Sequence, residues 1–169
     1  MKFNKKAFIS VVFLVGIITA IFIFSSQNGS ESDGVSFSFS RIFCKLLFSE
    51  FDEMTPEQQL FIISGLNHFI RKAAHFTAYT FLGICSYTFF YFSGIRLWKA
   101  VFPPAVILCA AYAVFDELHQ FFTPGRSLMI TDMLLDTAGS VFGIALAMIT
   151  AIVFANIKSN IISRRKNKS

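Results

Sequence analysis

The sequence predicts an all-α integral membrane protein, a bundle of four transmembrane helices with an additional amphipathic helix at the membrane interface. Three observations predict this class. Of the 169 residues, 54% are hydrophobic and only 15% are charged, which is unlike an ordinary soluble domain. The apolar residues are gathered in blocks about 20 residues long, the length of helix that spans the hydrocarbon layer. None of these blocks has the polar face that a helix of a soluble bundle needs.

Four blocks are predicted to span the membrane within a single domain, residues 1–169: residues 7–24, 73–92, 97–115 and 133–157. The ionisable groups inside them are few, namely His75, Lys99 and Asp136. Lys99 lies near the start of its block, where a lysine side chain reaches the interface. The first block is too long for a secretory signal and is followed by no cleavage site, so we expect an uncleaved anchor.

The positions of Lys and Arg predict the orientation. With four spans, all ten acidic residues lie on one side, together with five bases: Arg41, Lys45, Arg71, Lys72 and Arg126. The other side holds no acid and ten of the 15 basic residues: Lys2, Lys5, Lys6, Arg96, Lys99, Lys158, Arg164, Arg165, Lys166 and Lys168. Because basic segments are retained in the cytoplasm, both termini are expected there. The net charge of +5 is therefore explained by basic segments that are retained in the cytoplasm beside anionic lipid. It does not indicate a nucleic-acid partner.

The longest segment between spans, residues 25–70, is expected on the outer side. Its Ser/Gly/Asn-rich start, residues 25–32, predicts a loop. Apolar residues then recur at helical spacing, opposite Arg41 and Lys45: Phe39, Ile42, Phe43, Leu46 and Leu47. This pattern is typical of a helix lying in the plane of the membrane interface.

A second helix is predicted to begin at Thr55 within the same segment. Thr55 would be the N-cap, Pro56 the first helical residue, and Gln58 the partner that completes a capping box. Little between residues 59 and 73 forces this helix to end before the second span, so the two are expected to be continuous.

Polar side chains follow one face of three predicted spans, at their outer ends. The sets are Asn67, Arg71, His75 and Tyr79; then Tyr112, Asp116 and Gln120 with Glu117 beside them; and Asp132 and Asp136 with Gly139 and Gly143. A tight turn over residues 123–126, ending at Arg126, joins the last two sets. Ionisable groups in a membrane protein face inward and pair, so we expect one polar pocket at the outer rim of the bundle. The two glycines would allow another helix to approach closely.

Two other interpretations of these polar residues are weighed. Interhelical polar pairs alone hold helices together, but four carboxylates, two arginines and a histidine exceed that need and favour a binding site. A divalent cation is a further alternative, held by a histidine and by carboxylates: Asp116, Glu117, Asp132 and Asp136. The spacing matches no zinc pattern, so no metal ligand or cofactor is assigned.

Three motifs resemble the VanZ-like family of bacterial membrane proteins. They are Ser25-Ser26-Gln27, the run RKAAHFTAYTFLG at residues 71–83, and the run DELHQFFTPGRSLMITDMLLDTAG at residues 116–139. The matched positions are Arg71, Lys72, His75, Tyr79, Asp116, Glu117, Gln120, Pro124, Gly125, Arg126, Asp132, Asp136 and Gly139. At position 136 the family pattern takes Asn or Asp. The resemblance implies a bacterial plasma-membrane protein of the cell envelope; the founding member is linked to resistance to teicoplanin, a glycopeptide antibiotic that binds cell-wall precursors outside the membrane.

The first functional hypothesis is a non-enzymatic protein of the cell envelope. Its pocket would bind an anionic lipid headgroup or a lipid-linked cell-wall precursor. Arg71, Lys72 and Arg126 would contact phosphate, and Asp132 and Asp136 would orient the arginines.

The second hypothesis is an intramembrane hydrolase or transferase acting on an envelope lipid or wall precursor. His75 would serve as general base or nucleophile, with Asp116 or Glu117 as its orienting or second acidic group. A transporter is less favoured, because the polar groups gather at one end of the spans. Whether a reaction is catalysed, and in what oligomeric state, stays open at the level of sequence.

Overall fold

The computed structural model describes residues 4–95 and 98–166, and this part of the chain contains helices and no strand. In chain order the elements are α1 (Lys5–Ser25), α2 (Gly29–Leu47), the short 3-10 helix η1 (Phe51–Glu53), α3 (Pro56–Phe92), α4 (Trp98–Phe121) and α5 (Ile130–Lys166). The predicted all-α class is confirmed.

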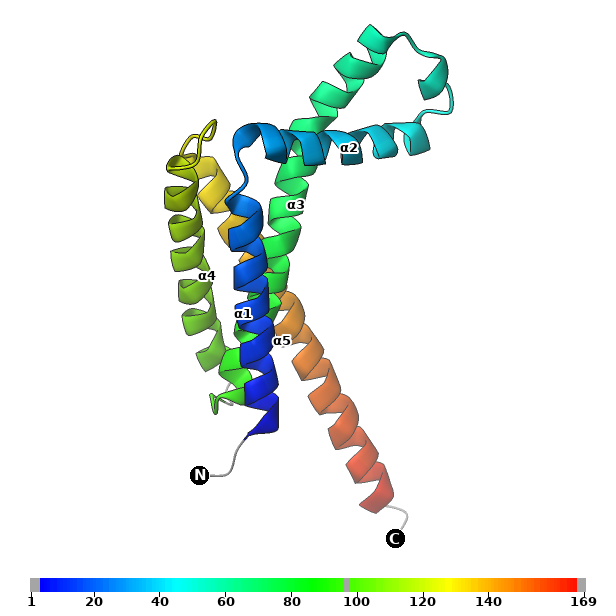
Figure 1. Ribbon diagram of the computed structural model, residues 1–169. Helices are drawn as coiled ribbons and strands as arrows, with labels where there is room; N and C mark the ends of the chain where they lie inside the picture. The colour runs from blue at the N-terminus through cyan, green and yellow to red at the C-terminus, as the bar shows by residue number, and fades with distance from the viewer. Residues whose placement is uncertain (1–3, 96–97, 167–169) are drawn as a thin grey trace.

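Four of the helices lie alongside one another, α1 and α4 running in one direction and α3 and α5 in the other (Figure 1). Three segments are long and apolar enough to cross a membrane: Lys5–Ser25, Ala100–Phe121 and Ile130–Arg164. The predicted span 73–92 forms the C-terminal half of α3 but is not among them, because its histidine, tyrosine, threonine and serine residues lower its mean hydropathy. Large apolar side chains are exposed along all three segments, as a lipid-facing surface requires.

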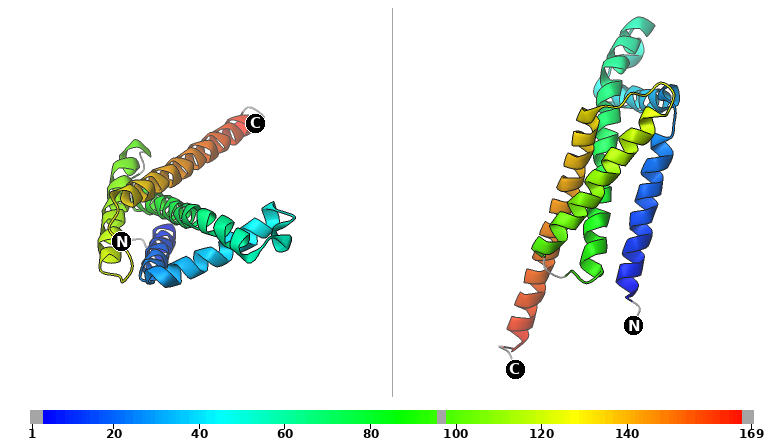
Figure 2. Two further views of the ribbon diagram at one scale, coloured as in Figure 1. Left: turned by 90° about the horizontal axis from the view of Figure 1, so that it is seen from above. Right: turned by 90° about the vertical axis from the view of Figure 1, so that its left-hand side faces the viewer.

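The lengths of the helices differ from the predicted spans. α4 continues past residue 115 to Phe121, because the polar residues that follow the apolar block are buried against neighbouring helices and stay helical. α5 begins before residue 133 and extends beyond residue 157, and its C-terminal half runs away from the other helices (Figure 2). Residue 97, the predicted start of the third span, lies outside the described residues.

The closest contact between helices is that of α3 with α5. A Cβ atom added to Gly139 would lie 2.6 Å from the carbonyl oxygen of Phe76, and one added to Gly143 would collide with the carbonyl oxygen of Thr80. Gly83 on α3 meets the backbone of Ser140 in the same way. The predicted close approach at Gly139 and Gly143 is confirmed, and it fixes how α3 and α5 face each other at the polar site.

The helix α2 lies across the end of the bundle, crosswise to α1 (Figure 1). It begins at Gly29, so the prediction of a loop throughout residues 25–32 is wrong, and the connection from α1 is short. Serine and acidic residues favour the first turn of a helix, which explains why this polar stretch is helical. The predicted apolar face is exposed, with Leu46 at 79%, as a helix resting on a membrane surface needs.

The helix α3 begins with the predicted capping box and runs without a break to Phe92. The Thr55 hydroxyl accepts the backbone N–H of Gln58 at 3.3 Å, and the Gln58 side chain accepts the backbone N–H of Thr55 at 3.0 Å. The Glu57 carboxylate accepts hydrogen bonds from the backbone N–H of Glu57 and from the Thr55 side chain. These hydrogen bonds hold the pKa of Glu57 below its usual value. The expected continuity of this helix with the predicted second span is confirmed.

The turn between α4 and α5 is also as predicted. The backbone N–H of Arg126 donates to the carbonyl of Thr123 at 3.2 Å, and Gly125 has a φ of 76°. Proline followed by a residue with positive φ is the pattern of a type II turn, and Pro124 and Gly125 supply it. This turn brings the end of α4 and the start of α5 together.

Candidate functional site

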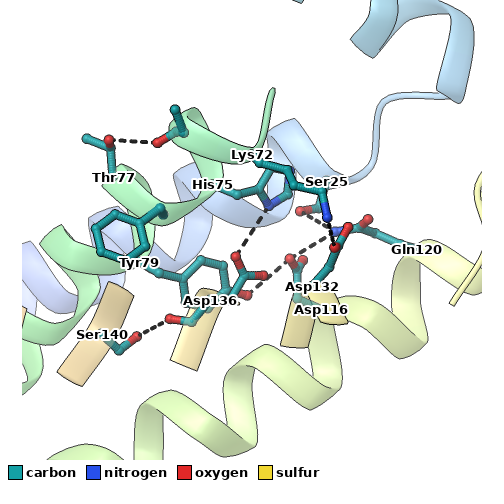
Figure 3. Close-up of polar contacts among 12 residues, drawn as sticks. Ser25, Lys72, His75, Thr77, Tyr79, Asp116, Gln120, Asp132, Asp136 and Ser140 are labelled. Atoms are coloured by element: carbon teal, nitrogen blue, oxygen red, sulfur yellow. Dashed lines mark hydrogen bonds and ion pairs between the residues drawn. The ribbon is translucent and has the colours of Figure 1, made fainter. Parts of the chain in front are cut away.

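The predicted polar residues meet where the ends of α1 and α4, the start of α5 and the middle of α3 come together (Figure 3). A small cavity of about 110 Å³ lies there. Seven of the ten predicted site residues line it: Arg71, Lys72, His75, Gln120, Arg126, Asp132 and Asp136. The stripes on three separate helices therefore do converge on one pocket.

Asp116 is the centre of a buried hydrogen-bond network at the base of this pocket. Its Oδ2 atom accepts the Tyr79 hydroxyl at 3.1 Å and the Gln120 side-chain amide at 3.0 Å. The same amide nitrogen lies 3.3 Å from the Ser25 hydroxyl, and the Gln120 carbonyl oxygen accepts Arg126 at 2.8 Å. Asp116 is 1% exposed, so its carboxylate is closed off from the surface, whereas Gln120 and Arg126 line the pocket. The network joins α1, α3, α4 and the α4–α5 turn.

Asp136 lies beside His75, with its Oδ1 atom 3.8 Å from Nδ1 of the imidazole (Figure 3). Its carboxylate is 1% exposed, and neither oxygen has a hydrogen-bond partner among the described residues. Asp136 therefore accepts no hydrogen bond from a described arginine, and the expectation that it orients the arginines stays a prediction. The glycine packing explains this placement: Gly139 seats one turn of α5 on the backbone of Phe76, next to His75.

Lys72 and Asp132 form an ion pair of 2.8 Å at the rim of the pocket. Both side chains are 30% exposed, so this pair remains partly solvated. The partner of Asp132 is thus a lysine of α3.

Glu117 does not line the pocket, although it was predicted as a site residue. Its Oε2 atom accepts the backbone N–H of Met129 at 2.9 Å, and the residue is 2% exposed. It ties the start of α5 to the end of α4, which is a structural role. The predicted partner of His75 was Asp116 or Glu117. In the structure Asp116 belongs to the same close group as His75, and Asp136 lies 3.8 Å from the imidazole.

Ser25 is a site residue that sequence reasoning missed. It is 2% exposed and contacts Gln120, while the next residue, Ser26, lies 3.1 Å from Nε2 of His119. The Ser-Ser-Gln motif at the end of the first span carried the only signal for this contact. Spacing along one helix cannot reveal it, because Ser25 reaches the site from a different helix.

A larger, mainly apolar cavity of about 710 Å³ adjoins the polar pocket. It lies among α1, α2 and α3, and its apolar walls include Ile17, Ile21, Phe24, Phe39, Phe43, Ala74, Ala78 and Phe81. Three residues line both cavities: Arg71, His75 and Arg126. A basic edge therefore separates the polar space from the apolar one.

The family model described as VanZ/LLP1 matches residues 9–153. The chain belongs to the VanZ/LLP1 family. The match includes all ten predicted site residues and agrees with the resemblance carried by the three motifs. No curated protein and no solved structure matched the chain.

In this VanZ/LLP1 protein, the site offers two kinds of chemistry. Arg71 and Arg126 supply fixed positive charge, which suits an anionic ligand. His75, Asp116 and Asp136 form a group whose ligand-type atoms all lie within 4.8 Å of one another, an arrangement that suits a cation. A further cavity of about 940 Å³ lies at the opposite end, mainly between α3 and α5, and the described residues that line it include no acidic one.

Proposed function

We propose that this VanZ/LLP1 protein lies in the bacterial plasma membrane and binds an anionic envelope lipid or a lipid-linked cell-wall precursor at its outer side. The observation that supports this proposal is the junction of the two cavities at Arg71, His75 and Arg126. An amphiphile with an anionic headgroup needs an apolar space and a basic polar space side by side, and the junction offers both.

The apolar cavity suits the hydrocarbon part of such a ligand. Its volume of about 710 Å³ falls within the range of about 300–1,000 Å³ that is typical of small-molecule sites. Its walls come from α1 and α3 and from the apolar face of α2, which would rest on the membrane surface.

The headgroup would lie against Arg71 and Arg126. A guanidinium group binds phosphate through two parallel hydrogen bonds, and such charge-assisted bonds are stronger than neutral ones. Lys72 adds positive charge at the rim, where its ammonium group pairs with Asp132. Arg126 likewise donates to Gln120, which holds its guanidinium group in place at the pocket.

The arrangement of the helices supports a fourth span in α3. α1 and α4 run in the same direction, and α3 returns between them (Figure 1). If α1 and α4 both cross the membrane, the chain that connects them must cross once in the opposite direction. The C-terminal half of α3, residues 73–92, is the helix in position to do so.

The charges support cytoplasmic termini. The first turn of α1 and the last turns of α5 lie at the same end, which carries Lys5, Lys6, Lys158 and Arg164. The acidic residues lie toward the other end with the pocket. Lys2, Arg96 and Lys168, also counted in this asymmetry, lie outside the described residues. The positive-inside rule then places the pocket outside.

Lipid binding can be measured on purified protein by native mass spectrometry. The probes are phosphatidylglycerol, phosphatidylcholine with the same acyl chains, and a polyprenyl pyrophosphate. We expect the two anionic lipids to bind and the zwitterionic lipid to bind at least about tenfold more weakly. Arg71→Gln should weaken anionic binding, whereas Arg164→Gln, at the far end of α5, should not. Equal binding of all three lipids would contradict the proposal.

The family resemblance implies an effect on glycopeptide susceptibility. Expression in a teicoplanin-susceptible bacterium is expected to raise the minimal inhibitory concentration, and Arg71→Ala is expected to abolish that rise at equal protein level. Resistance that persists unchanged in Arg71→Ala would separate the phenotype from the pocket.

A hydrolase or transferase is not favoured over binding. Glu117, one predicted partner of His75, is occupied by the backbone of Met129. The Asp136 carboxylate lies 3.8 Å from the imidazole, beyond hydrogen-bonding distance.

A further inference from the structure

We propose that His75, Asp116 and Asp136 bind a divalent transition-metal cation. This inference goes beyond the binding of an envelope lipid and does not depend on it. The three residues come from α3, α4 and α5, and their coordinating atoms lie within 4.8 Å of one another. A single ion placed among them could contact one atom of each.

The second observation is that buried oxygen atoms at this point have no hydrogen-bond partner. Among the described residues, none donates to either carboxylate oxygen of Asp136 or to Oδ1 of Asp116. Both residues are 1% exposed. A buried polar atom without a partner is costly, and a carboxylate is the costliest case. A cation between the two carboxylates would contact Oδ1 of Asp116 and one oxygen of Asp136, and it would balance their charge.

The other oxygen of Asp116 shows how the site is oriented. Its Oδ2 atom accepts hydrogen bonds from Tyr79 and Gln120, which leaves Oδ1 to face the group. Hydrogen bonds of this kind to the second oxygen are what hold a coordinating carboxylate in place in metal sites. Tyr79 and Gln120 would therefore be positioning residues, because they hold the Asp116 carboxylate.

The charges are consistent with a divalent ion. Two carboxylates at close range repel each other in a buried setting, and one divalent cation balances both. His75 would coordinate as a neutral imidazole. One nitrogen ligand with two oxygen ligands suits Zn²⁺ or Mn²⁺ better than Mg²⁺ or Ca²⁺, which prefer oxygen alone.

His75 and Asp136 also line the polar pocket. An ion held by three protein groups keeps further coordination positions for water or for an anion. The cation would therefore face the space in which the proposed headgroup lies.

The test measures metal content without lipid. Full-length protein in detergent is stripped with a chelator and dialysed against Zn²⁺ or Mn²⁺, and bound metal is determined by inductively coupled plasma mass spectrometry. We expect about one ion per chain, a Kd measurable by calorimetry, and a higher Tm on adding the metal to stripped protein.

Asp136→Asn should weaken metal binding at least about tenfold, and so should His75→Ala. The matched control is Asp52→Asn, which makes the same change in η1, outside the pocket. The Asp52 carboxylate is 69% exposed and pairs with Lys45, so this variant should bind metal as the wild type does.

The proposal is overturned if stripped wild-type protein takes up no Zn²⁺ or Mn²⁺, or if Asp136→Asn and Asp52→Asn lose metal binding equally. If Asp136→Asn fails to fold, two measurements still test the proposal. They are the rise in Tm of the wild type on adding metal and the metal binding of the His75→Ala variant. Because no lipid is present, a failure of lipid binding would leave this result unchanged.

Discussion

At the scale of single residues, Asp116 is held by donors from two helices. Its side chain is 1% exposed, and both donors reach its Oδ2 atom. One of them, Tyr79, is itself completely buried on α3. Its hydroxyl therefore has no access to water, and its hydrogen bond links α3 to α4.

Tyr79→Phe should lower the free energy of unfolding by about 1 kcal/mol, because the ring is retained and one buried hydrogen bond is lost. Reversible unfolding of the detergent-solubilised protein would measure the change. Tyr91→Phe is the control, since Tyr91 lies on the same helix outside the site and is 36% exposed. Equal effects of the two changes would argue against a network centred on Asp116.

At the scale of helices, the contact between α3 and α5 determines the geometry of the pocket. Gly139 and Gly143 allow the backbones to touch, and this seats Asp136 opposite His75. A bulkier residue would push α5 away from α3 and separate the two side chains. Close packing at the two glycines is therefore needed to keep Asp136 next to His75.

Gly143→Ala is expected to destabilise the protein by about 2 kcal/mol, because its Cβ would collide with the backbone carbonyl of Thr80. The same unfolding assay applies. Gly16→Ala makes an identical change in α1, where nothing lies within 4 Å of the added atom. It should change stability by less than about 1 kcal/mol, in the stabilising direction. Destabilisation by Gly16→Ala as large as that by Gly143→Ala would contradict the packing argument.

Local patterns in the sequence predicted the elements well. The capping box at Thr55, the turn at Pro124 and Gly125, and the glycine contact each depend on a few neighbouring residues, and the structure confirms each of them. The apolar blocks likewise identified three helices long and apolar enough to cross a membrane. These features depend on local backbone preferences and on hydropathy, and both can be read from the residue types in a short stretch of sequence.

Partners across helices could not be predicted in the same way. Periodicity shows which face of a helix carries Asp132 or Asp136, but not which side chain of another helix lies opposite. The rotation and depth of each helix are set by packing. For this reason the sequence identified the residues of the pocket, while the pairs Lys72–Asp132 and His75–Asp136 emerged only from the structure.

At the scale of the whole molecule, the proposal depends on which way α3 and the pocket face. Mean hydropathy alone does not identify α3 as a span, because polar residues such as His75 and Tyr79 make the helix less apolar. Several of these polar side chains are buried against other helices, namely Tyr79, Ser86 and Tyr87. A helix surrounded by protein can cross a membrane with a more polar composition than one that faces lipid.

Labelling of single cysteines in intact cells tests this topology. The three native cysteines, Cys44, Cys85 and Cys109, are first replaced, and a cysteine is then introduced at Ser127, Ser93 or Ser163, all of which are exposed. A membrane-impermeant maleimide should label position 127 from outside, because this residue follows the α4–α5 turn and lines the pocket. Positions 93 and 163 should react only after permeabilisation, since the first follows α3 and the second lies near the end of α5. Labelling of position 93 in intact cells would mean that α3 does not cross, and labelling of position 163 would place the basic end of the bundle outside.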